Sequence, residues 1–193
     1  MAIQSVPVLL AAGEVMRLSA TMQDLANTPD DGYRYELLRG VLLRMPPPQE
    51  EHGQISALLI GSLIPYCRTL GMLKRLVADI GYELRGNDIS PTVLAPDVSI
   101  IRTPKTAGTT YSSDAPLLAV EIASPSQGRP YLQDKAELYL AAGTVLVWVV
   151  WPESRTVDVW TQPGAPVTRS VGETLDGGTV LPGLTIPVGD LFP

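Results

Sequence analysis

Short apolar runs separated by turn-forming residues dominate the chain. Residues 33–38 and 41–45 flank Arg39-Gly40, and a pair of this kind between two apolar runs predicts a β-hairpin. Three consecutive prolines at 46–48 then end the second strand. Other runs rich in Val, Ile and Leu and bounded by Gly, Pro or Asp predict strands at residues 73–84, 98–101, 117–123, 145–150, 156–161 and 167–170.

Three segments with helical features lie between these strands. Residues 19–25 predict a short helix capped by Ser19 or Thr21. Residues 49–70 predict a long helix that Pro65 should kink or shorten. Residues 130–142 predict a third helix, with proline in its first turn and glycine just after its end.

The order of these elements indicates the fold class. A strand, a helix and a second apolar strand over residues 117–150 predict a crossover between two parallel strands. We therefore expect an α/β or α+β fold: a mixed β-sheet core flanked by helices, with an N-terminal hairpin and short C-terminal strands. A length of 193 residues suits one domain, which we place at residues 19–193 after an N-terminal arm at residues 1–18.

Composition and charge narrow the class of protein. Hydrophobic residues make up 45% of the chain and charged residues 18%, which is typical of a folded globular domain. The net charge of −6 repels nucleic acid, so any DNA binding should be weak and should need a local basic surface or a divalent cation. Cys67 is the only cysteine, and no apolar run reaches the length of a membrane helix. We expect a cytoplasmic protein with no membrane partner.

Two acidic residues stand where burial is expected. Asp97 follows Pro96 at the start of an apolar strand, and Glu121 lies inside an apolar run. An ionised carboxylate in the interior is costly unless a cation or hydrogen bonds compensate it. Each acid alone is explained if it ends a strand or pairs with an arginine such as Arg102, whereas one shared cation would stabilise both.

Lys135 adds a positive charge to the same region. It falls on the apolar side of the helix predicted at residues 130–142, so its ammonium group either reaches along the surface to solvent or points to an interior anion. Strand-end carboxylates are suitable ligands for Mg²⁺ or Mn²⁺. Two acids and a lysine around such an ion predict phosphodiester hydrolysis by a metal-activated water.

An ordered set of motifs resembles the Uma2 family. The motifs are Tyr35-Glu36-Leu37, Glu51-His52-Gly53, Ala95-Pro96-Asp97-Val98, Val120-Glu121-Ile122-Ala123-Ser124-Pro125-Ser126, Lys135 with Tyr139 and Ala142-Gly143, and Trp148-Val149-Val150. The resemblance covers about residues 18 to 193. It implies a restriction-endonuclease-like fold of the PD-(D/E)XK nuclease superfamily, in which the catalytic lysine can lie on a helix after the strand. It also implies a homodimer.

The resemblance assigns roles to individual residues. It implies that Asp97, Glu121 and the carbonyl group of Ile122 bind the metal ion, and that Lys135 supports catalysis. If one Mg²⁺ is shared, the two carboxylates should approach within about 5 Å, since each Mg–O distance is about 2.1 Å. Lys135 should then point into the same cleft.

Two further residues are candidates of second rank. His52 matches a family position at the start of a helix that faces the site, where it would carry a proton or contact phosphate; helix capping or packing is the alternative. If His52 serves the site, its imidazole should open onto the cleft that contains Asp97. Glu36 is either an additional acid beside the metal ion or the partner of Arg34 or Arg39.

Three positions depart from the family pattern. The family usually has an acid four residues before the helix lysine, where this chain has Tyr131, and an acid after the hairpin glycine, where it has Val41. It also has Asp before the proline that ends the long strand, where Trp151 stands. These losses favour the alternative of a non-catalytic binding or scaffold protein that keeps the nuclease fold.

The expected function is that of a metal-dependent endonuclease acting on nucleic acid, DNA in the first instance. A metal-dependent hydrolase of small phosphoesters is a further alternative. The chain has no Gly-x-Ser-x-Gly motif, so Ser124 and Ser126 are expected to cap the following helix instead of acting as nucleophiles. We expect weak association with the steep salt dependence of phosphate contacts, made through Lys74, Arg75, Arg85 or Arg102.

Overall fold

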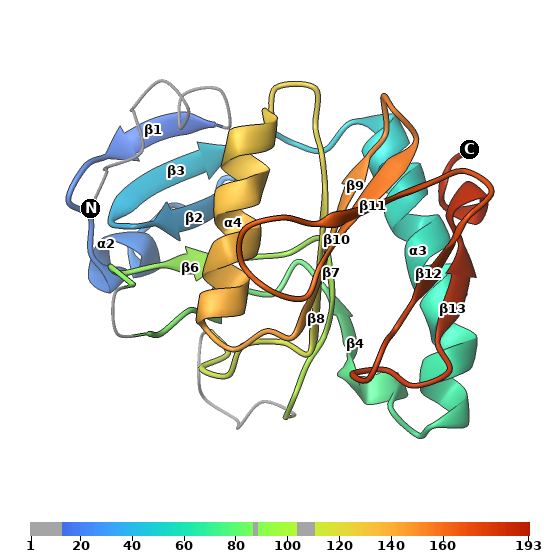
Figure 1. The fold of residues 1–193 in the computed structure, drawn as a ribbon. Helices are drawn as coiled ribbons and strands as arrows, with labels where there is room; N and C mark the ends of the chain where they lie inside the picture. Colours follow the sequence, from blue (N-terminus) through green and yellow to red (C-terminus); the bar gives the residue numbers. More distant parts are fainter. Residues whose placement is uncertain (1–12, 87–88, 104–110) are drawn as a thin grey trace.

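The computed structural model describes residues 13–86, 89–103 and 111–193, and this part of the chain contains three β-sheets flanked by helices (Figure 1). A five-stranded sheet has the order β1-β3-β2-β6-β5, and a six-stranded sheet has the order β11-β10-β9-β8-β7-β4. The five-stranded sheet consists of β1 (Glu14–Arg17), β2 (Arg34–Leu38), β3 (Val41–Met45), β5 (Tyr82–Glu83) and β6 (Val93–Leu94).

The six-stranded sheet is the centre of the fold. Its strands are β4 (Leu76–Ala78), β7 (Val98–Ile100), β8 (Leu118–Ile122), β9 (Leu146–Trp151), β10 (Thr156–Trp160) and β11 (Val167–Ser170). Strands β8 and β9 are parallel and are joined by helix α4 (Arg129–Ala141), whereas the other neighbouring pairs are antiparallel. The predicted crossover, the mixed sheet and the α+β class are therefore confirmed.

The predicted hairpin and helices are present with small shifts. Arg39 and Gly40 both have positive φ between β2 and β3, as a two-residue hairpin turn with the favoured twist requires. Thr21 caps helix α2 (Met22–Ala26) in a capping box with Asp24. Helix α3 (Glu50–Thr69) continues past Pro65, so the predicted shortening is wrong; Pro65 is exposed, and water can therefore bind the carbonyl group that lacks an amide partner.

The strand predicted at residues 73–84 is broken in the structure. A 3₁₀ turn at Leu73–Arg75 precedes β4, and β5 belongs to the other sheet. The break falls at Asp79, whose φ of 52° lies in the left-handed region, and it is followed by Gly81, where an added Cβ would lie 2.7 Å from the Tyr111 ring. The chain thereby crosses from one sheet to the other.

Each face of the six-stranded sheet has its own apolar core. Val120 and Ile122 of β8 pack in one core with helix α3, and Ala119 packs in the other core with helix α4 and the five-stranded sheet. Because side chains alternate along a strand, Glu121 shares the face of Ala119 and points to α4. The strand pattern therefore directs a carboxylate into the layer between the two sheets.

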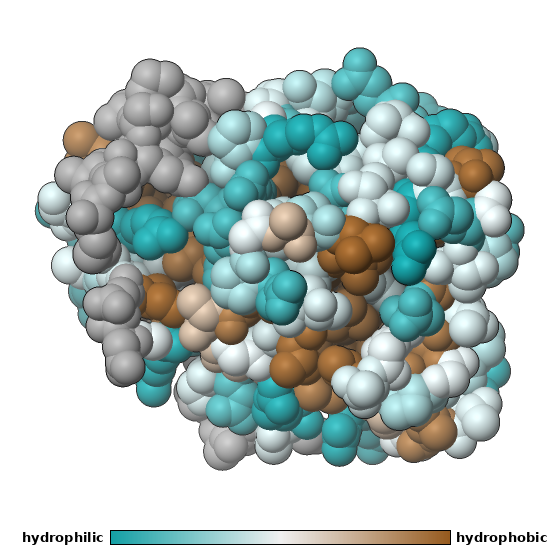
Figure 2. Space-filling model, in the orientation of Figure 1, coloured by the Kyte–Doolittle hydropathy of each residue, from teal (hydrophilic) through white to brown (hydrophobic). Residues whose placement is uncertain are grey.

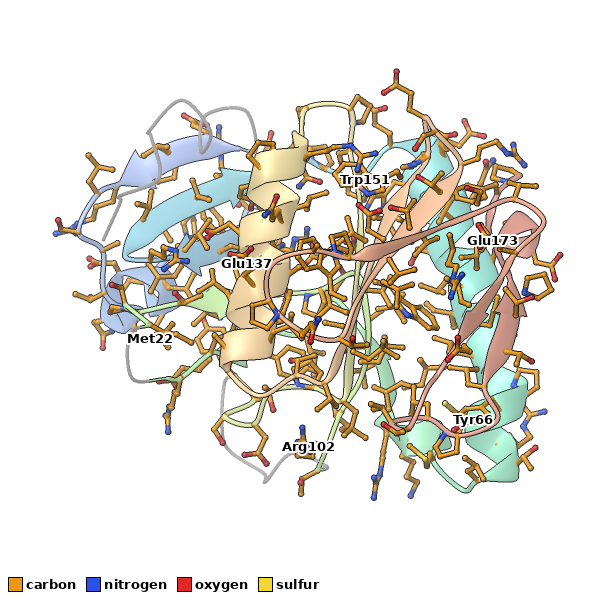
Figure 3. All side chains as sticks on the ribbon, viewed as in Figure 1. Met22, Tyr66, Arg102, Glu137, Trp151 and Glu173 are labelled. Carbon is orange, nitrogen blue, oxygen red and sulfur yellow. The ribbon has the colours of Figure 1, made fainter. Side chains whose placement is uncertain are left out.

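The C-terminal segment forms part of the core that covers α3. Strands β12 (Thr174–Asp176) and β13 (Thr185–Pro187) pair with each other, and a 3₁₀ turn at Val188–Leu191 follows. The leucines of residues 174–191 and Val188 are buried beside α3. The Tyr66 hydroxyl donates a hydrogen bond to the Pro182 carbonyl at 3.2 Å (Figure 3). Strands β12 and β13 were not predicted; the short strands predicted at residues 156–161 and 167–170 are β10 and β11 of the six-stranded sheet.

The predicted N-terminal arm lies partly outside the described residues, since residues 1–12 are not among them. Glu14–Arg17 of the arm form β1, which pairs with β3, so the folded region starts before residue 19. Within the described part of the chain, no helix combines the length and the apolar character needed to cross a membrane.

Candidate active site

The chain brings the two predicted acids together where it passes between the sheets. Asp97 stands in the connection from β6 of one sheet to β7 of the other, and Val98 of β7 pairs with Val120 of β8. Continued by one residue, this antiparallel register places Asp97 opposite Glu121 on the same face. Residues directly opposite each other have Cβ atoms about 4.5–5.5 Å apart. The register is thus compatible with a shared cation, which remains a prediction.

Lys135 lies at the centre of the inner half of the site. Its ammonium nitrogen is 2.8 Å from Glu121 Oε2 and 3.2 Å from Glu36 Oε1, and its side chain has no exposed surface. The second oxygen of Glu121 accepts a hydrogen bond from the Tyr139 hydroxyl at 2.8 Å. Of the two possibilities for Lys135, the structure shows the interior anion and not the route to solvent.

Glu36 joins this group from the five-stranded sheet. It is fully buried on β2 and accepts hydrogen bonds from Lys135, from the Ala95 amide at 3.3 Å and from the Tyr131 hydroxyl at 3.3 Å. The alternative pairing of Glu36 with Arg34 or Arg39 is wrong. The Arg34 guanidinium instead binds Asp79 and Asp97. The Arg39 guanidinium binds Asp134. We refer to Glu36, Asp97, Glu121 and Lys135 as the acid cluster.

Asp97 forms the outer half of the site and has different partners. Its Oδ2 accepts hydrogen bonds from the Ile122 amide at 2.7 Å and from His52 Nε2 at 3.2 Å. Its Oδ1 lies 3.4 Å from Nη1 of Arg34. The structure therefore shows the Ile122 amide group in contact with Asp97, while binding of a metal ion by the Ile122 carbonyl stays a prediction.

A cleft of about 530 Å³ opens onto this outer half. Asp97, His52 and Arg34 line it together with prolines 46–48 and Ser124. The imidazole of His52 thus opens onto the cleft that contains Asp97, as expected if it serves the site. Glu121 and Lys135 are not among the lining residues, so Lys135 lies behind Asp97 and does not reach the cleft itself.

Burial and neighbouring charges perturb the proton affinities of the site. Burial raises the pKa of Glu121 to about 7; Lys135 opposes this rise, while Asp97 and Glu36 add to it. Burial would also raise the pKa of Asp97, but the hydrogen bond from His52 and the charges of His52 and Arg34 lower it below its ordinary value. In turn, the contact with Asp97 raises the pKa of His52 despite the opposing effect of burial.

The donor set fits a hard divalent cation. Two buried glutamates, Glu36 and Glu121, share the buried ammonium group of Lys135, and burial together with the neighbouring acids raises the pKa of Glu121 although Lys135 opposes the rise. The candidate ligands are oxygen atoms, which Mg²⁺ and Mn²⁺ prefer. Among the described residues, no three His, Cys, Asp or Glu side chains form a ready metal-binding group. A metal site here would need a backbone carbonyl or water as well as the two acids.

The departures from the family pattern have structural explanations. Tyr131 donates its hydroxyl to Glu36 and so supports the cluster from the position of a missing acid. The indole nitrogen of Trp151 donates to Asp158 at 2.7 Å, outside the cluster. Val41 is paired in the hairpin, opposite Leu38. The expected capping by Ser124 or Ser126 is wrong, since Gly128 stands at the start of α4 and no side chain caps it.

Sequence reasoning missed three contributors to the site. Arg34 and Asp79 form an ion pair at the cleft, and Tyr139 binds Glu121. Tyr139 lies four residues after Lys135 on α4, and this spacing was the available signal for a shared target. Lys74, Arg75, Arg85 and Arg102 do not line the cleft described here, and Arg102 instead donates to the Gly143 carbonyl.

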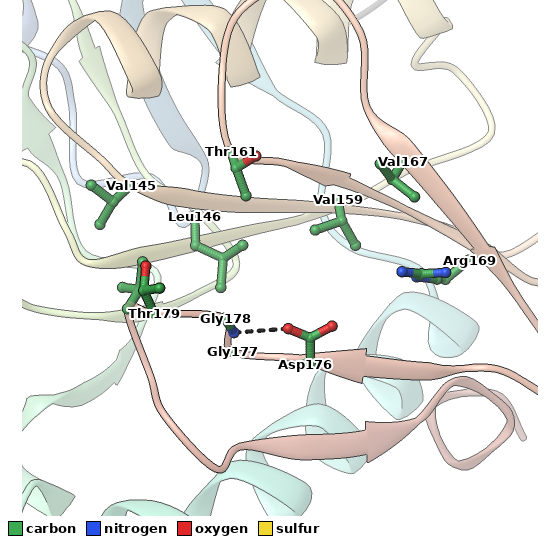
Figure 4. Close-up of a pocket in the computed structure, with 11 residues that line it drawn as sticks. Val145, Leu146, Val159, Thr161, Val167, Arg169, Asp176, Gly177, Gly178 and Thr179 are labelled. Carbon is green, nitrogen blue, oxygen red and sulfur yellow. Dashed lines mark hydrogen bonds between the residues drawn. The ribbon is translucent and has the colours of Figure 1, made fainter.

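A second hollow, of about 390 Å³, lies between the β9–β11 region and the segment around β12 (Figure 4). Figure 2 shows hydrophobic side chains gathered in the middle of the face that is turned to the viewer in Figure 1. Its walls include Val145, Val159 and Val167, and Asp176 accepts a hydrogen bond from the Gly178 amide at 2.9 Å. Since this hollow contains one acid and no lysine or histidine, the Asp97 cleft is the better candidate for catalysis.

Comparisons with known proteins agree with this geometry. A crystal structure from Anabaena variabilis ATCC 29413, described as "a putative nuclease belonging to DUF820", matches with a TM-score of 0.75 and 19% sequence identity, over 89% of this chain and 97% of that one. At this identity the match shows that the two chains share a fold. The search of curated proteins gave no significant match. The model of the Uma2 family, described as "Putative restriction endonuclease", matches residues 21–189. Because this match spans most of the chain, including the acid cluster and the cleft, the chain belongs to the Uma2 family.

Proposed function

We propose that the protein is a divalent-metal-dependent endonuclease that hydrolyses phosphodiester bonds, with DNA as the substrate. The observation that carries this proposal is the acid cluster itself. Two buried glutamates share one buried ammonium group, and a third buried acid, Asp97, lines an open cleft beside Arg34 and His52. Buried acids held at such a cost, beside a cleft, are more typical of a functional site than of a stabilising one.

The proposed roles follow from where each side chain lies. Asp97, Glu121 and the Ile122 carbonyl would hold Mg²⁺ or Mn²⁺, which when bound lowers the pKa of a water ligand and polarises a phosphoryl group. Lys135 opposes the rise in the pKa of Glu121 and fixes the positions of Glu121 and Glu36 through its two ion pairs. His52 presents an imidazole at the cleft, where it can donate a hydrogen bond to a phosphate oxygen or transfer a proton.

The charge of the protein limits how DNA would bind. A net charge of −6 disfavours a long electrostatic footprint, so few phosphates would be contacted at once. The cationic groups that line the cleft are Arg34 and, when protonated, His52. Because none of the basic residues predicted to contact phosphates lines the cleft, we now expect weak DNA binding with a small salt dependence instead of a steep one.

Nicking of supercoiled plasmid tests the proposal. Mg²⁺ or Mn²⁺ should support slow nicking, while Ca²⁺ should bind without supporting turnover because its looser coordination activates water poorly. Asp97→Asn should lower the nicking rate by at least about 100-fold, as loss of a ligand to a catalytic metal ion does. Asp158→Asn is the matched control, since it changes a buried acid outside the cluster.

The same assay separates the alternatives. Nicking that is equal in wild type and Asp97→Asn would show that a contaminant is responsible. A folded wild type that binds no Mn²⁺ in calorimetry would favour a non-catalytic scaffold. Hydrolysis of nucleotides or of a small aryl phosphate, with no action on DNA, would point to a small-phosphoester hydrolase.

A further inference from the structure

One arginine connects the acid cluster to an exposed acid at the cleft. Nη1 of Arg34 lies 2.8 Å from Asp79 Oδ1 and 3.4 Å from Asp97 Oδ1. The two carboxylates differ in environment, because the Asp79 side chain is 66% exposed and that of Asp97 only 4%. Arg34 itself is 31% exposed, and all three residues line the cleft. The guanidinium therefore lies between a solvent-exposed carboxylate and a buried one.

The two oxygens of Asp97 are not equally engaged. Oδ2 accepts two hydrogen bonds, from the Ile122 amide and from His52. Oδ1 contacts Arg34 through the longest of the polar contacts of this carboxylate. A cation approaching from the cleft would therefore find Oδ1 to be the oxygen with more free acceptor capacity. Arg34 is the group that stands beside this oxygen.

We propose that Arg34 competes with the divalent metal ion for Asp97 Oδ1 and moves to Asp79 when the metal binds. This inference rests on the metal site in the proposed function. Without metal, the guanidinium contributes positive charge that the buried carboxylates need. With metal, two cations beside one carboxylate would repel each other, and Asp79 provides the arginine with a partner outside the site.

The arrangement allows this movement for Arg34 and not for Lys135. Lys135 has no exposed surface and binds two buried glutamates, so leaving them would strand both charges in the interior. Arg34 already makes its shorter contact to Asp79, and its partly exposed side chain needs only to lose the longer one. Asp79 is held within reach because it occupies the break between β4 and β5.

Calorimetric titration of Mn²⁺ into the full chain without DNA tests the competition. Arg34→Gln should tighten Mn²⁺ binding by roughly three- to tenfold, because it removes a competing cation a few ångströms from the ligand. Asp79→Asn should weaken binding by roughly two- to threefold, since Arg34 then has Asp97 as its remaining acid partner among these contacts. In the Arg34→Gln background, Asp79→Asn should have little further effect, because the arginine through which it acts is gone.

Arg44→Gln is the matched control. Arg44 lies on the neighbouring strand β3 and pairs with Glu14, so its replacement removes the same charge without touching Asp97. Mn²⁺ affinity in this variant should stay within about twofold of wild type. In the unmodified protein, the NMR signal of the Arg34 guanidinium should also shift when Mg²⁺ is added.

Each outcome decides a different point. Mn²⁺ binding that is unchanged or weaker in Arg34→Gln, with a wild type that binds, would overturn the competition and leave the proposed nuclease intact. Equal tightening in Arg34→Gln and Arg44→Gln would also overturn it, since only net charge would then matter. If wild type, Arg34→Gln and Arg44→Gln all fold but bind no Mn²⁺, the metal site and the competition fail together.

Discussion

Two buried acidic sites in this protein, Asp158 and the acid cluster, differ in how many donors and cations compensate each carboxylate. Asp158 on β10 accepts hydrogen bonds from Trp151 at 2.7 Å, Thr168 at 2.6 Å and Arg129 at 3.1 Å. One carboxylate there has three donors, including a cation on its exposed side. In the acid cluster two buried glutamates share the ammonium group of Lys135, and burial raises the pKa of Glu121 to about 7. Asp158 thus has three donors to itself, while Glu36 and Glu121 have one cation between them.

The difference separates a structural acid from a functional one. The Asp158 group links β9, β10, β11 and α4 through short hydrogen bonds, which is sufficient reason to keep a buried acid there. The acid cluster gains no such balance and instead opens to the cleft through Asp97. An excess of buried negative charge beside a cleft is therefore the more informative signal for cation binding.

The largest effect is expected for Lys135→Met. This change leaves Glu36 and Glu121 buried without their cation, and breaking a buried ion pair in this way costs about 3–5 kcal/mol. We expect that loss in the free energy of unfolding at pH 8, measured with urea in the presence of a chelator. The loss should be smaller at pH 5, where Glu121 can bind a proton. A loss below about 1 kcal/mol at pH 8 would mean that Lys135 does not stabilise the buried glutamates.

Glu121→Gln should have a smaller, pH-dependent effect. The pKa of Glu121 is raised from 4.5 to about 7 in the folded protein, so its contribution to stability is fully present below pH 4.5 and is lost as the pH rises through 7. At about 1.4 kcal/mol per pKa unit, this loss is on the order of 3 kcal/mol. The metal-free variant should therefore be less sensitive to pH than wild type between pH 4.5 and 8.

Urea unfolding of both proteins across this pH range measures the difference. The raised pKa of His52 adds a loss of stability in the same direction at higher pH, but it acts in both proteins and should largely cancel in the comparison. Parallel curves for wild type and Glu121→Gln would show that the glutamate is ordinary. Mg²⁺ should reduce the loss at pH 8 in wild type alone.

Asp158→Asn should have the smallest effect on stability and should leave nicking unchanged. The asparagine oxygen can still accept a hydrogen bond from Trp151 or Thr168. The new NH₂ group would face the other of these two donors, and this costs about 1–2 kcal/mol in the free energy of unfolding. Nicking per folded molecule should equal that of wild type at 25 °C. A large loss of activity without unfolding would erase the distinction between the two groups.

The parts of the fold carried by local pattern could be predicted from the sequence. The β8–α4–β9 crossover and the β2–β3 hairpin follow from apolar periodicity and from Arg39-Gly40. Asp97, Glu121 and Lys135 stood out because charged residues within apolar segments need a partner. Their partners could not be predicted in the same way, since Glu36 meets Lys135 across 99 positions of sequence.

The missed features depend on tertiary context. Apolar residues at 73–84 indicate a strand, but the left-handed Asp79 and the close approach at Gly81 divide them between two sheets. This same break places Asp79 beside Arg34. Because the break was not predicted, the ion pair between these two residues could not be predicted either. The predicted shortening at Pro65 was wrong because an exposed helix face tolerates a missing amide donor.

The packing of helix α3 has a consequence for folding kinetics. Its buried residues contact partners from residues 175–192, and the bond between Tyr66 and Pro182 spans 116 positions. Contacts of such sequence separation slow folding, because a long loop must close before they form. The core around helix α3, which carries His52, is therefore complete only after the distant C-terminal strands have docked. We expect the cleft to form fully late in folding, and partly folded chains to be inactive.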